Sequence, residues 1–327
     1  MTDTAKRTIL ITGGAGFIGS ALCDDFLDQG HTVKCMDNFA TGKKANIEHL
    51  ADNEDFEFVE ADIRDIDACS SAMKGVDIVL HQAALGSVPR SIKDPLTTNA
   101  VNISGMLNIL EAARLAGVKR FVYAASSSTY GDSKELPKVE ERIGKPLSPY
   151  AVTKYTNEVY ADLYHELFGM ETIGLRYFNV FGRRQDPDGA YAAAIPKFIR
   201  SFMEGTSPQV HGDGEQTRDF TYIKNVEQAV RNAAFTQNEK AYGQVFNVAY
   251  GKNCSVNELL RILIEKLSRF DPNVKTVLVD HVAERVGDVR DSLASIEKAR
   301  NVFGYDPKYD LDSGLEEAIQ WYWDSLH

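Results

Sequence analysis

Tyr150 and Lys154 are the residues whose types and spacing most directly suggest chemistry. Four positions apart on a helix, they would place a phenol and an ammonium on one face. An unperturbed tyrosine has a pKa of about 10, which leaves it protonated at neutral pH. A neighbouring positive charge stabilises the phenolate and lowers that pKa. The pair could therefore take a proton from a hydroxyl group, provided that a reacting molecule is held beside it.

The residues before the pair predict the helix that would carry it. Pro149 suits the first turn of a helix and Ser148 suits the capping position before it, so we expect the pair near an exposed helix start. Taken alone, a tyrosine and a lysine at this spacing are more often a simple surface contact. The serines at 126–128 follow an apolar run and would supply a hydroxyl to orient the reacting oxygen, although serines alone more often mark a turn.

A glycine-rich segment follows the first predicted strand. Residues 8–12 are apolar or β-branched, and an amphipathic segment that ends near Gln29 begins among the glycines Gly13, Gly16 and Gly19. Glycines let the backbone approach a pyrophosphate, and a helix N-terminus offers unpaired N–H groups to it. This order of strand, tight turn and helix predicts a phosphate-binding site.

An acidic residue lies where a dinucleotide site needs one. The second predicted strand, residues 31–36, ends at Asp37. That offset from the glycines is typical of a carboxylate that accepts from an adenosine ribose. Asp37 would also repel a 2′-phosphate, which favours NAD over NADP, whereas the nearby Lys43 and Lys44 weaken that preference.

Strand-like and helix-like segments alternate along most of the chain. Strands are expected at residues 56–60, 77–80, 120–125, 171–176 and 244–249, with helices at 65–74, 95–116 and 192–203. This alternation predicts an α/β fold with a doubly wound parallel sheet. Ligand-binding residues of such a sheet lie at the carboxyl ends of its strands, where Asp62 and residues 82–84 and 126–128 fall. Beyond Ser255, helices alternate with one strand expected near 274–279.

The composition is that of an ordinary globular protein, with 327 residues that are 43% hydrophobic and 25% charged. The formal charge of −11 argues against a general binder of nucleic acids or anionic membranes. The four cysteines lack C-x-x-C spacing, and no apolar run is long enough to span a bilayer, so we expect a cytoplasmic protein with reduced thiols. His165 and Glu166 do not complete a zinc motif because residue 169 is glycine, and no metal site is expected.

The motifs in order resemble those of the extended short-chain dehydrogenase/reductases that act on nucleotide sugars. The matching segments are TGGAGFIG at 12–19, Asp37, QAA at 82–84, SSSTYG at 126–131, YAVTK at 150–154, RYFNVFG at 176–182 and RDFTYIKNV at 218–226. The resemblance implies a Rossmann domain that binds NAD and a smaller C-terminal α/β domain that binds the nucleotide sugar. The expected NAD domain is residues 1–178, rejoined by 218–248, and the expected sugar-nucleotide domain is residues 179–217 and 249–327.

The resemblance also implies roles for individual residues, with Ser126, Tyr150 and Lys154 as the catalytic set. The residues implied at the cofactor are Gly13, Gly16, Phe17, Ile18, Gly19, Asp37, Asn38, Phe39, Gly42, Asp62, Ile63, Gln82, Ala83, Ala84, Tyr150, Lys154, Tyr177 and Val180. Those implied at the substrate are Gly86, Ser87, Ser126, Ser127, Tyr150, Asn179, Gln185, Ala193, Arg218, Arg285, Asp288 and Ser292. A homodimer through the helix near Pro95 and the helix that bears Tyr150 is common in the family.

The serine triplet helps to decide which reaction on the sugar the resemblance implies. Relatives that dehydrate the sugar carry an acidic pair after the strand-end threonine, and relatives that decarboxylate carry a glutamate there, whereas this chain has serines at 126–128. No carboxylate is then in place to abstract a C5 proton, which favours epimerisation at C4. The strings ALGSVPRS at 84–91, SSSTYGD at 126–132 and FNVFGRRQDPDGAYAAAIPKF at 178–198 most resemble the epimerases of UDP-N-acetylglucosamine that prefer N-acetylated sugars.

Ser292 lies where epimerases restricted to non-acetylated sugars carry a tyrosine, and its small side chain leaves room for an acetamido group. The same room would admit UDP-glucose or a uronate. An epimerase of UDP-glucuronate or UDP-N-acetylglucosaminuronate is therefore an alternative, and it would need a cation facing C6, for which Arg90 or Arg183 is a candidate. A silent NAD-binding sensor is a second alternative, against which the intact catalytic set argues.

Overall fold

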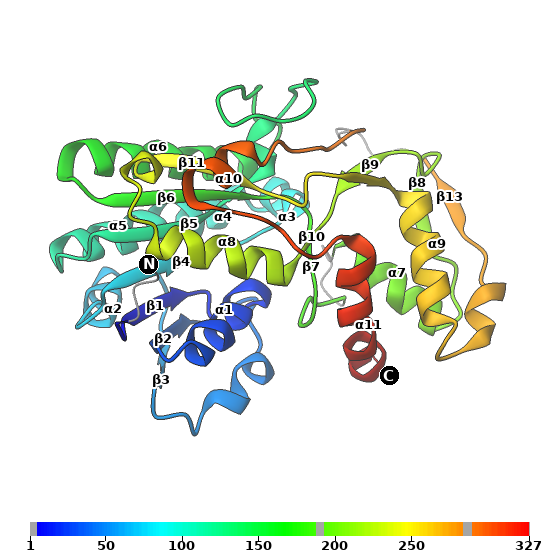
Figure 1. Cartoon of the computed structure of the whole chain (residues 1–327), viewed down its shortest axis with the longest axis horizontal. Coiled ribbons are helices and arrows are strands. Elements are labelled where there is room, and N and C mark those ends of the chain that lie inside the picture. Colours follow the sequence, from blue (N-terminus) through cyan, green and yellow to red (C-terminus); the bar gives the residue numbers. More distant parts are fainter. Residues whose placement is uncertain (1–4, 188–192, 284–289, 327) are drawn as a thin grey trace.

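A seven-stranded parallel sheet forms the centre of the computed structural model, which describes residues 5–187, 193–283 and 290–326 (Figure 1). Its strand order is β11-β6-β5-β4-β1-β2-β3. The strands are β1 (Thr8–Thr12), β2 (Thr32–Asp37), β3 (Phe56–Glu60), β4 (Ile78–His81), β5 (Arg120–Ser126), β6 (Glu171–Tyr177) and β11 (Gln244–Val248). The doubly wound α/β fold predicted from the sequence is confirmed.

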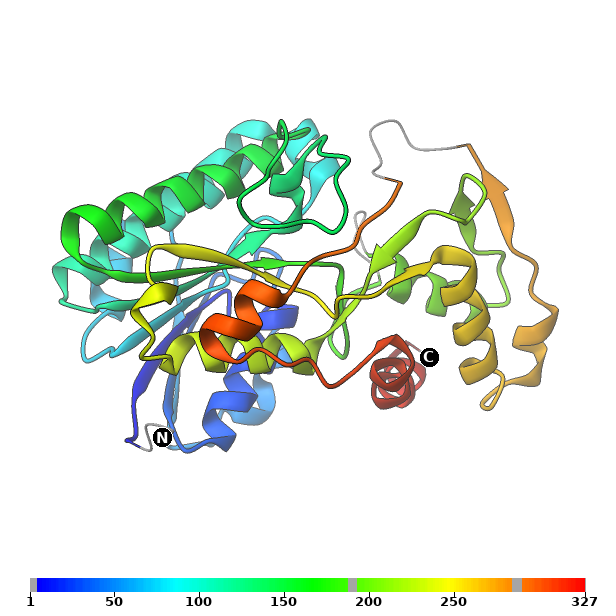
Figure 2. The ribbon, with the colours of Figure 1, turned by 45° about the horizontal axis from the view of Figure 1, so that its top comes forward.

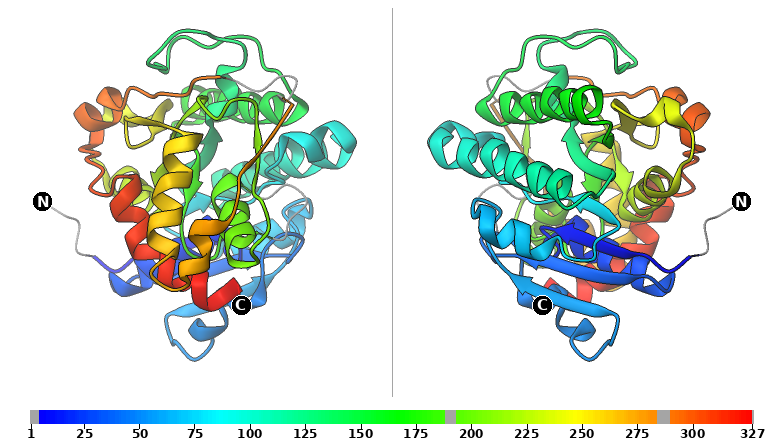
Figure 3. Two further views of the ribbon diagram at one scale, coloured as in Figure 1. Left: turned by 90° about the vertical axis from the view of Figure 1, so that its right-hand side faces the viewer. Right: turned by 90° about the vertical axis from the view of Figure 1, so that its left-hand side faces the viewer.

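Helices cover both faces of the sheet, as the largely apolar central strands require. On one face lie α1 (Phe17–Asp28) and α8 (Ile223–Phe235), and on the other lie α2 (Ile66–Ala72), α5 (Met106–Leu115) and α6 (Pro149–Phe168). Figure 3 shows α5 and α6 running side by side on their face. Two separate hydrophobic clusters, one on each side of the sheet, result from this arrangement.

The helix expected at 95–116 is present but is not regular. It consists of α4 (Pro95–Asn99), a π-helical turn at Ala100–Gly105 and then α5, and a short helix, α3 (Val88–Lys93), precedes it. A Cβ on Gly105 would lie 2.6 Å from the Ile63 side chain, so glycine lets this turn pass close to the loop after β3. Such π-helical turns are often found at functional sites.

The C-terminal half adds three two-stranded sheets beside the main sheet (Figure 2). They pair β7 (Val180–Phe181) with β10 (Thr221–Tyr222), β9 (Thr217–Asp219) with β12 (Asn253–Ser255), and β8 (Gln209–His211) with β13 (Asp280–Val282). Besides α8, the α-helices that the structure describes in this half are α7 (Ala194–Met203), α9 (Val256–Leu267), α10 (Glu297–Phe303) and α11 (Leu311–Leu326). Within the described residues, no helix is both long and apolar enough to cross a membrane.

The prediction of a strand near 274–279 is wrong. Pro272–Thr276 forms a 3-10 helix instead, because Pro272 sets its first turn and the Asp271 carboxylate accepts from the N–H of Asn273. The strand of this region comes later, as β13.

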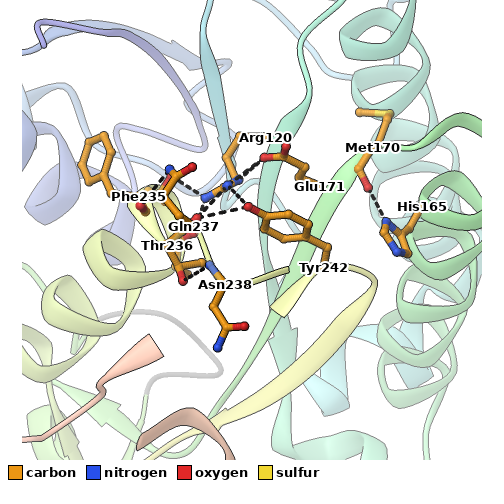
Figure 4. A network of polar contacts seen from close by, with 11 residues as sticks. Arg120, His165, Met170, Glu171, Phe235, Thr236, Gln237, Asn238 and Tyr242 are labelled. Atoms are coloured by element: carbon orange, nitrogen blue, oxygen red, sulfur yellow. Dashed lines mark hydrogen bonds and ion pairs between the residues drawn. The ribbon is translucent and has the colours of Figure 1, made fainter. Parts of the chain in front are cut away.

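Hydrogen bonds from Arg120 join the amino end of β5 to the C-terminal end of α8 (Figure 4). Its guanidinium donates to the carbonyl oxygens of Ala233 and Ala234 at 2.9 and 2.7 Å and to Glu171 Oε2 at 2.7 Å. The carbonyls at a helix C-terminus lack partners within the helix, and Arg120 supplies them. This network lies at the end of β5 opposite Ser126, so it supports the sheet without entering the candidate site.

Candidate active site

Tyr150 and Lys154 lie in the first two turns of α6, and the predicted cap is confirmed. Ser148 Oγ accepts from the N–H of Ala151 at 3.1 Å, and Pro149 is the first helical residue. The expected exposed helix start is wrong, however. Lys154 is only 3% exposed and Tyr150 is half-buried, because this end of α6 packs against the carboxyl end of β5.

Ser126 is the last residue of β5 and faces the phenol. Burial raises the pKa of Tyr150, and a hydrogen bond with the Ser126 side chain opposes that rise. Ser126 Oγ also accepts from the N–H and the hydroxyl of Ser128, at 3.2 and 2.9 Å. The Ser126 hydroxyl is thus held by its own turn while it contacts the tyrosine.

Lys154 keeps its charge at neutral pH even though it is buried. Burial lowers its pKa to about 8, and the negative charge of Glu158, one turn further along α6, limits the fall. Glu158 is itself paired with Arg176, whose Nη2 lies 2.7 Å from Glu158 Oε2, and both side chains are buried. Burial and, secondarily, the Lys154 charge lower the pKa of the buried His81 to about 3, so that imidazole is neutral. Lys154 is therefore an ammonium group that lies one helical turn beyond Tyr150 and lines the same cavity.

The glycine loop forms a close-fitting cradle between β1 and α1. Gly13 has φ of +68°, and a Cβ there would lie 2.7 Å from the backbone nitrogen of Ala83. A Cβ on Gly19 would lie 2.1 Å from the carbonyl oxygen of Gly13. Only glycine fits either position, so the loop leaves backbone N–H groups at the start of α1 open to a phosphate.

Asp37 ends β2 as predicted and is nearly buried. Its Oδ2 accepts from the N–H of Ala15 at 3.0 Å and its Oδ1 from the N–H of Phe39 at 2.8 Å. Burial raises its pKa, and these backbone bonds oppose the rise. A carboxylate oxygen can accept a second hydrogen bond, so Asp37 can still bind a ribose hydroxyl. Lys43 Nζ lies 2.8 Å from Asp186 Oδ2, which engages that lysine away from a 2′-phosphate.

Asp62 lies beyond the end of β3 and forms an ion pair with Arg64 that was not expected from the sequence. Arg64 Nη2 donates to Asp62 Oδ2 at 2.6 Å, and Asn38 Nδ2 donates to the same oxygen at 2.9 Å. The hydrogen bonds from Arg64 are the main reason why the pKa of Asp62 falls to about 2. Arg64 therefore adds a guanidinium to this end of the sheet.

These residues meet in one cavity of about 490 Å³, called here the glycine-loop cavity. It is lined by most residues expected at the cofactor, namely Gly13, Gly16, Phe17, Ile18, Gly19, Asp37, Asn38, Asp62, Ile63, Gln82, Ala83, Ala84, Tyr150, Lys154 and Tyr177. Ser126 and Gly86 line it too. The remaining three lie elsewhere: Phe39 packs on Phe58, Gly42 lies against the Asp37 carboxylate, and Val180 belongs to β7.

A family model described as the NAD dependent epimerase/dehydratase family matches residues 9–249. The chain belongs to that epimerase/dehydratase family. Its match covers the glycine loop, the strand-end acids and the Tyr150–Lys154 pair, so the described residues that line the glycine-loop cavity all lie within the matched region.

Similar proteins from this family cover nearly the whole chain. The UDP-glucose 4-epimerase of Mycolicibacterium smegmatis is 35% identical over 316 residues, which is 96% of this chain and 97% of that protein. The structure of a UDP-N-acetylglucosamine 4-epimerase from Methanobrevibacter ruminantium, in complex with UDP-N-acetylmuramic acid, is 36% identical with a TM-score of 0.90 and covers 98% of this chain and 99% of its own. The structure of a UDP-glucuronic acid 4-epimerase from Bacillus cereus, in complex with UDP-glucuronic acid and NAD, is 33% identical with a TM-score of 0.88. The match covers 97% of this chain and 99% of that one.

Gln82 shows that the cavity suits the family's cofactor, NAD. The Tyr177 hydroxyl donates to Gln82 Oε1 at 3.1 Å, and Gln82 Nε2 is buried without a hydrogen-bond partner among the described residues. Buried donors are normally satisfied in folded proteins, so an unpaired amide beside a ligand cavity is a natural contact for a bound molecule. Together with the glycine cradle, this donor fits a dinucleotide.

Two further cavities adjoin the loop after β6. The Ser292 cavity, of about 610 Å³, is lined by Ser127, Asn179, Arg218 and Ser292. The Gln185 cavity, of about 630 Å³, is lined by Asn179, Gln185, Ala193 and Arg218. Both have a volume suited to part of a nucleotide sugar. Asn179 and Arg218 line both cavities, so they mark the boundary between them.

Gly86, Ser126 and Tyr150, which are also expected at the substrate, line the glycine-loop cavity. Among the described residues expected there, Ser87 is the one that lines none of these three cavities. Ser87 Oγ accepts from the N–H of Arg90 at 3.1 Å and thereby caps α3. Arg285 and Asp288 lie outside the described residues.

Several residues that line the cavities were not found from the sequence. Arg64, Thr41 and Val101 line the glycine-loop cavity, and Lys138 lines the Ser292 cavity. Arg64 follows Asp62 by two residues at a strand end, which is a signal that could have revealed it. Lys138 has no such signal, because its place depends on how a long loop folds back.

Proposed function

We propose that this protein catalyses the reversible C4 epimerisation of UDP-N-acetylglucosamine to UDP-N-acetylgalactosamine with bound NAD. The observation that carries the proposal is the position of the Ser126, Tyr150 and Lys154 side chains. They line the glycine-loop cavity, and Ser127 next to them lines the Ser292 cavity. A proton-handling pair thus lies between a dinucleotide site and a cavity large enough for a sugar.

In the proposed mechanism, Tyr150 takes the proton of the sugar 4-hydroxyl. Lys154 stabilises the phenolate, and Ser126 donates to the reacting oxygen and orients it. NAD, when bound, supplies a hydride acceptor for C4 and a donor for the return step. Tyr150 then gives its proton back to the oxygen at C4. A change of configuration requires that the 4-keto sugar turn within the site while the nucleotide stays bound.

The surroundings of the serine triplet support epimerisation over dehydration or decarboxylation. Among the described residues that line the Ser292 cavity, Asp291 is the only carboxylate. It accepts from the Thr217 hydroxyl at 2.9 Å, which ties it to β9. Among the described residues of this cavity, no carboxylate is thus free to remove a C5 proton, which supports hydride and proton transfer at C4 as the chemistry.

Ser292 supports an N-acetylated sugar as the preferred substrate. Its N–H donates to the carbonyl of Thr217 at 3.2 Å, so the backbone is fixed while the small side chain leaves the cavity open. The Methanobrevibacter ruminantium relative carries the name of such an epimerase. UDP-glucose would fit the same space. The competing candidate, a UDP-glucuronate or UDP-N-acetylglucosaminuronate epimerase, is favoured by the Bacillus cereus relative.

We further propose that the nucleotide sugar binds to residues 179–217 and 249–327, with NAD on residues 1–178 and 218–248. Arg218 would hold the diphosphate together with Arg285, since a guanidinium is permanently charged and donates in a fork. Asp288 would accept from the uridine ribose. The cytoplasmic location expected from the sequence stays a prediction.

A homodimer is also proposed, on the evidence of one apolar face of α6. Val152, Tyr155, Val159 and Leu163 follow one another at helical spacing and are 39% to 48% exposed. A continuous apolar stripe of this kind commonly marks a protein interface. Light scattering should give the mass of a dimer, and Val159→Lys should give that of a monomer; a monomeric wild-type protein would contradict the proposal.

The experiment that tests the function is a product assay. The purified protein is incubated with UDP-N-acetylglucosamine without added NAD, and the sugar nucleotides are separated. Formation of UDP-N-acetylgalactosamine supports the proposal. A protein that converts UDP-glucuronate but not UDP-N-acetylglucosamine would support the competing candidate instead.

A further inference from the structure

Lys138 is a buried lysine fixed directly beside Ser292. It lies in the loop between the 3-10 helix Ser127–Tyr130 and α6. This loop stands at the top of the molecule in Figure 1. Its N–H donates to the carbonyl of Leu293 at 2.8 Å, and its carbonyl accepts from the N–H of Ser295 at 2.9 Å. These two backbone bonds hold Lys138 against the segment that carries Ser292. Only 5% of the residue is exposed, and it lines the Ser292 cavity.

The Lys138 ammonium has unused hydrogen-bonding capacity. Its Nζ donates to the carbonyl oxygen of Ser133, whereas an ammonium carries three N–H donors. Among the residues that the structure describes, none offers it a carboxylate within 4.0 Å. Burial lowers the pKa of Lys138, and the more distant charge of Glu135 opposes the fall. A buried cation without a close counter-ion is unfavourable unless a ligand supplies the negative charge.

Neither arginine expected to face a sugar carboxylate lines any of the three cavities. Arg183 is exposed and donates to the carbonyl of Glu317 on α11 at 3.2 Å. Arg90 lies on α3. In the Ser292 cavity, Arg218 is the other cation among the described residues, and the proposed function assigns it to the diphosphate. Among the described residues of that cavity, Lys138 is thus the cation left for the sugar.

We propose that Lys138 binds a carboxylate carried by the sugar, so that the site accepts acidic UDP-N-acetylhexosamines as well as UDP-N-acetylglucosamine. The inference rests on the proposed function, because it assumes that the sugar enters the Ser292 cavity. Two sources could supply the carboxylate: an oxidised C6, as in a uronate, or a carboxyalkyl ether at O3. Both would pair with the same ammonium, and Ser127 and Ser292 would remain beside the sugar ring.

The test compares Lys138→Met with wild type and with Lys134→Met. Methionine keeps an unbranched side chain of similar length and removes the charge. Lys134 is exposed in the same loop, so its replacement removes an equal charge from the surface. For each protein, kcat/KM is measured with UDP-N-acetylglucosamine and UDP-N-acetylglucosaminuronate, and the Kd of UDP-N-acetylmuramic acid is measured by calorimetry. Bound NAD and thermal unfolding show whether each variant is intact.

In Lys138→Met, the ratio of uronate to neutral-sugar kcat/KM should fall about tenfold, equivalent to about 1.4 kcal/mol. Lys134→Met should leave the ratio unchanged. If the ratio holds but UDP-N-acetylmuramic acid binds about tenfold more weakly, the carboxylate is that of the O3 ether. An unchanged ratio and an unchanged Kd, in a variant that is folded, would overturn the proposal.

Failure of the proposed function would be seen separately. A wild-type protein that turns over neither sugar is not the proposed epimerase. The Kd values of UDP-N-acetylglucosamine and UDP-N-acetylglucosaminuronate in wild type and Lys138→Met then still test the lysine, because binding requires no turnover. A preference for the acidic ligand that Lys138→Met abolishes would support the proposal, and one that it leaves intact would refute it.

Discussion

Lys154 Nζ donates to the carbonyl oxygen of Ala124 at 2.7 Å, and this bond joins α6 to β5 inside the site. Ala124 precedes Ser126 by two residues, so the bond ties the helix that carries Tyr150 to the strand that carries Ser126. It also fixes the ammonium one turn of α6 beyond Tyr150, where the proposed mechanism uses its charge. This contact thereby sets the position of Lys154 relative to the strand that carries Ser126.

The first prediction concerns the pH dependence of turnover. The pKa of Lys154 is lowered to about 8, so the ammonium is charged below that pH and neutral above it. Loss of the charge removes the stabilisation of the Tyr150 phenolate, and kcat/KM should therefore decline as the pH rises through about 8. The apparent value belongs to the interacting pair. A profile from about pH 6 to about pH 10 checks this, and a rate that still increases at its alkaline end would contradict it.

The second prediction concerns sugar selection by Ser292. Ser292→Tyr should lower kcat/KM for UDP-N-acetylglucosamine by about 100-fold, because the ring fills the space for the acetamido group, and should lower that for UDP-glucose far less. Ser292→Ala is the matched control, since it keeps a small side chain and should preserve the preference. Equal losses on both sugars in the tyrosine variant would show that Ser292 does not select the substrate.

The third prediction concerns the buried His81, whose Nδ1 lies 2.8 Å from Thr12 Oγ1. Its folded-state pKa of about 3 is below the ordinary value of 6.5, so the unfolded chain takes up a proton that the folded protein does not. Stability is unaffected above pH 6.5 and falls as the pH drops below it. At about pH 5 the loss should be about 2 kcal/mol.

Denaturant unfolding of wild type and His81→Gln at about pH 7.5 and about pH 5 measures this loss. The variant lacks the titrating group, so wild type should lose about 2 kcal/mol relative to it over that interval. His281→Gln, at an exposed histidine, should follow wild type. Parallel losses in wild type and His81→Gln would exclude His81 as the cause.

The fourth prediction concerns the buried ion pair beneath Lys154. Glu158→Gln leaves the Arg176 guanidinium without its carboxylate and should destabilise the protein by about 3–5 kcal/mol. Because Glu158 raises the pKa of Lys154, the alkaline decline of kcat/KM should also move to lower pH. Asp162→Asn, on an exposed position of the same helix, should change neither property. An unchanged pH profile would mean that Glu158 does not act on Lys154.

The strands and the start of the helix that carries Tyr150 and Lys154 were predictable because each depends on local residues. Apolar runs and glycines define β1 and the turn at Gly13, and Ser148 and Pro149 define the start of α6. The burial of Lys154 was not predictable, since it arises from the packing of α6 on β5. The π-helical turn was not predictable either, and its last residue, Gly105, packs against Ile63, far away in sequence.

Contacts made by long loops could not be predicted either, because they also join residues that are far apart in the sequence. In the sequence, Lys138 is one of several charged residues in a polar loop. Its burial follows from the backbone hydrogen bonds between that loop and residues 293–295. The sequence predicts Gln82 in a turn, but it does not reveal that Tyr177 donates to the Gln82 oxygen or that the amide nitrogen is buried without a partner among the described residues.

The most direct test of the account compares wild type with Tyr150→Phe in the conversion of UDP-N-acetylglucosamine to UDP-N-acetylgalactosamine. Bound NAD and thermal unfolding are measured on the same samples. We predict that kcat falls by at least about 1,000-fold, while bound NAD and the unfolding temperature stay close to those of wild type. Near-normal turnover by Tyr150→Phe would contradict the central claim that Tyr150 takes the proton of the 4-hydroxyl.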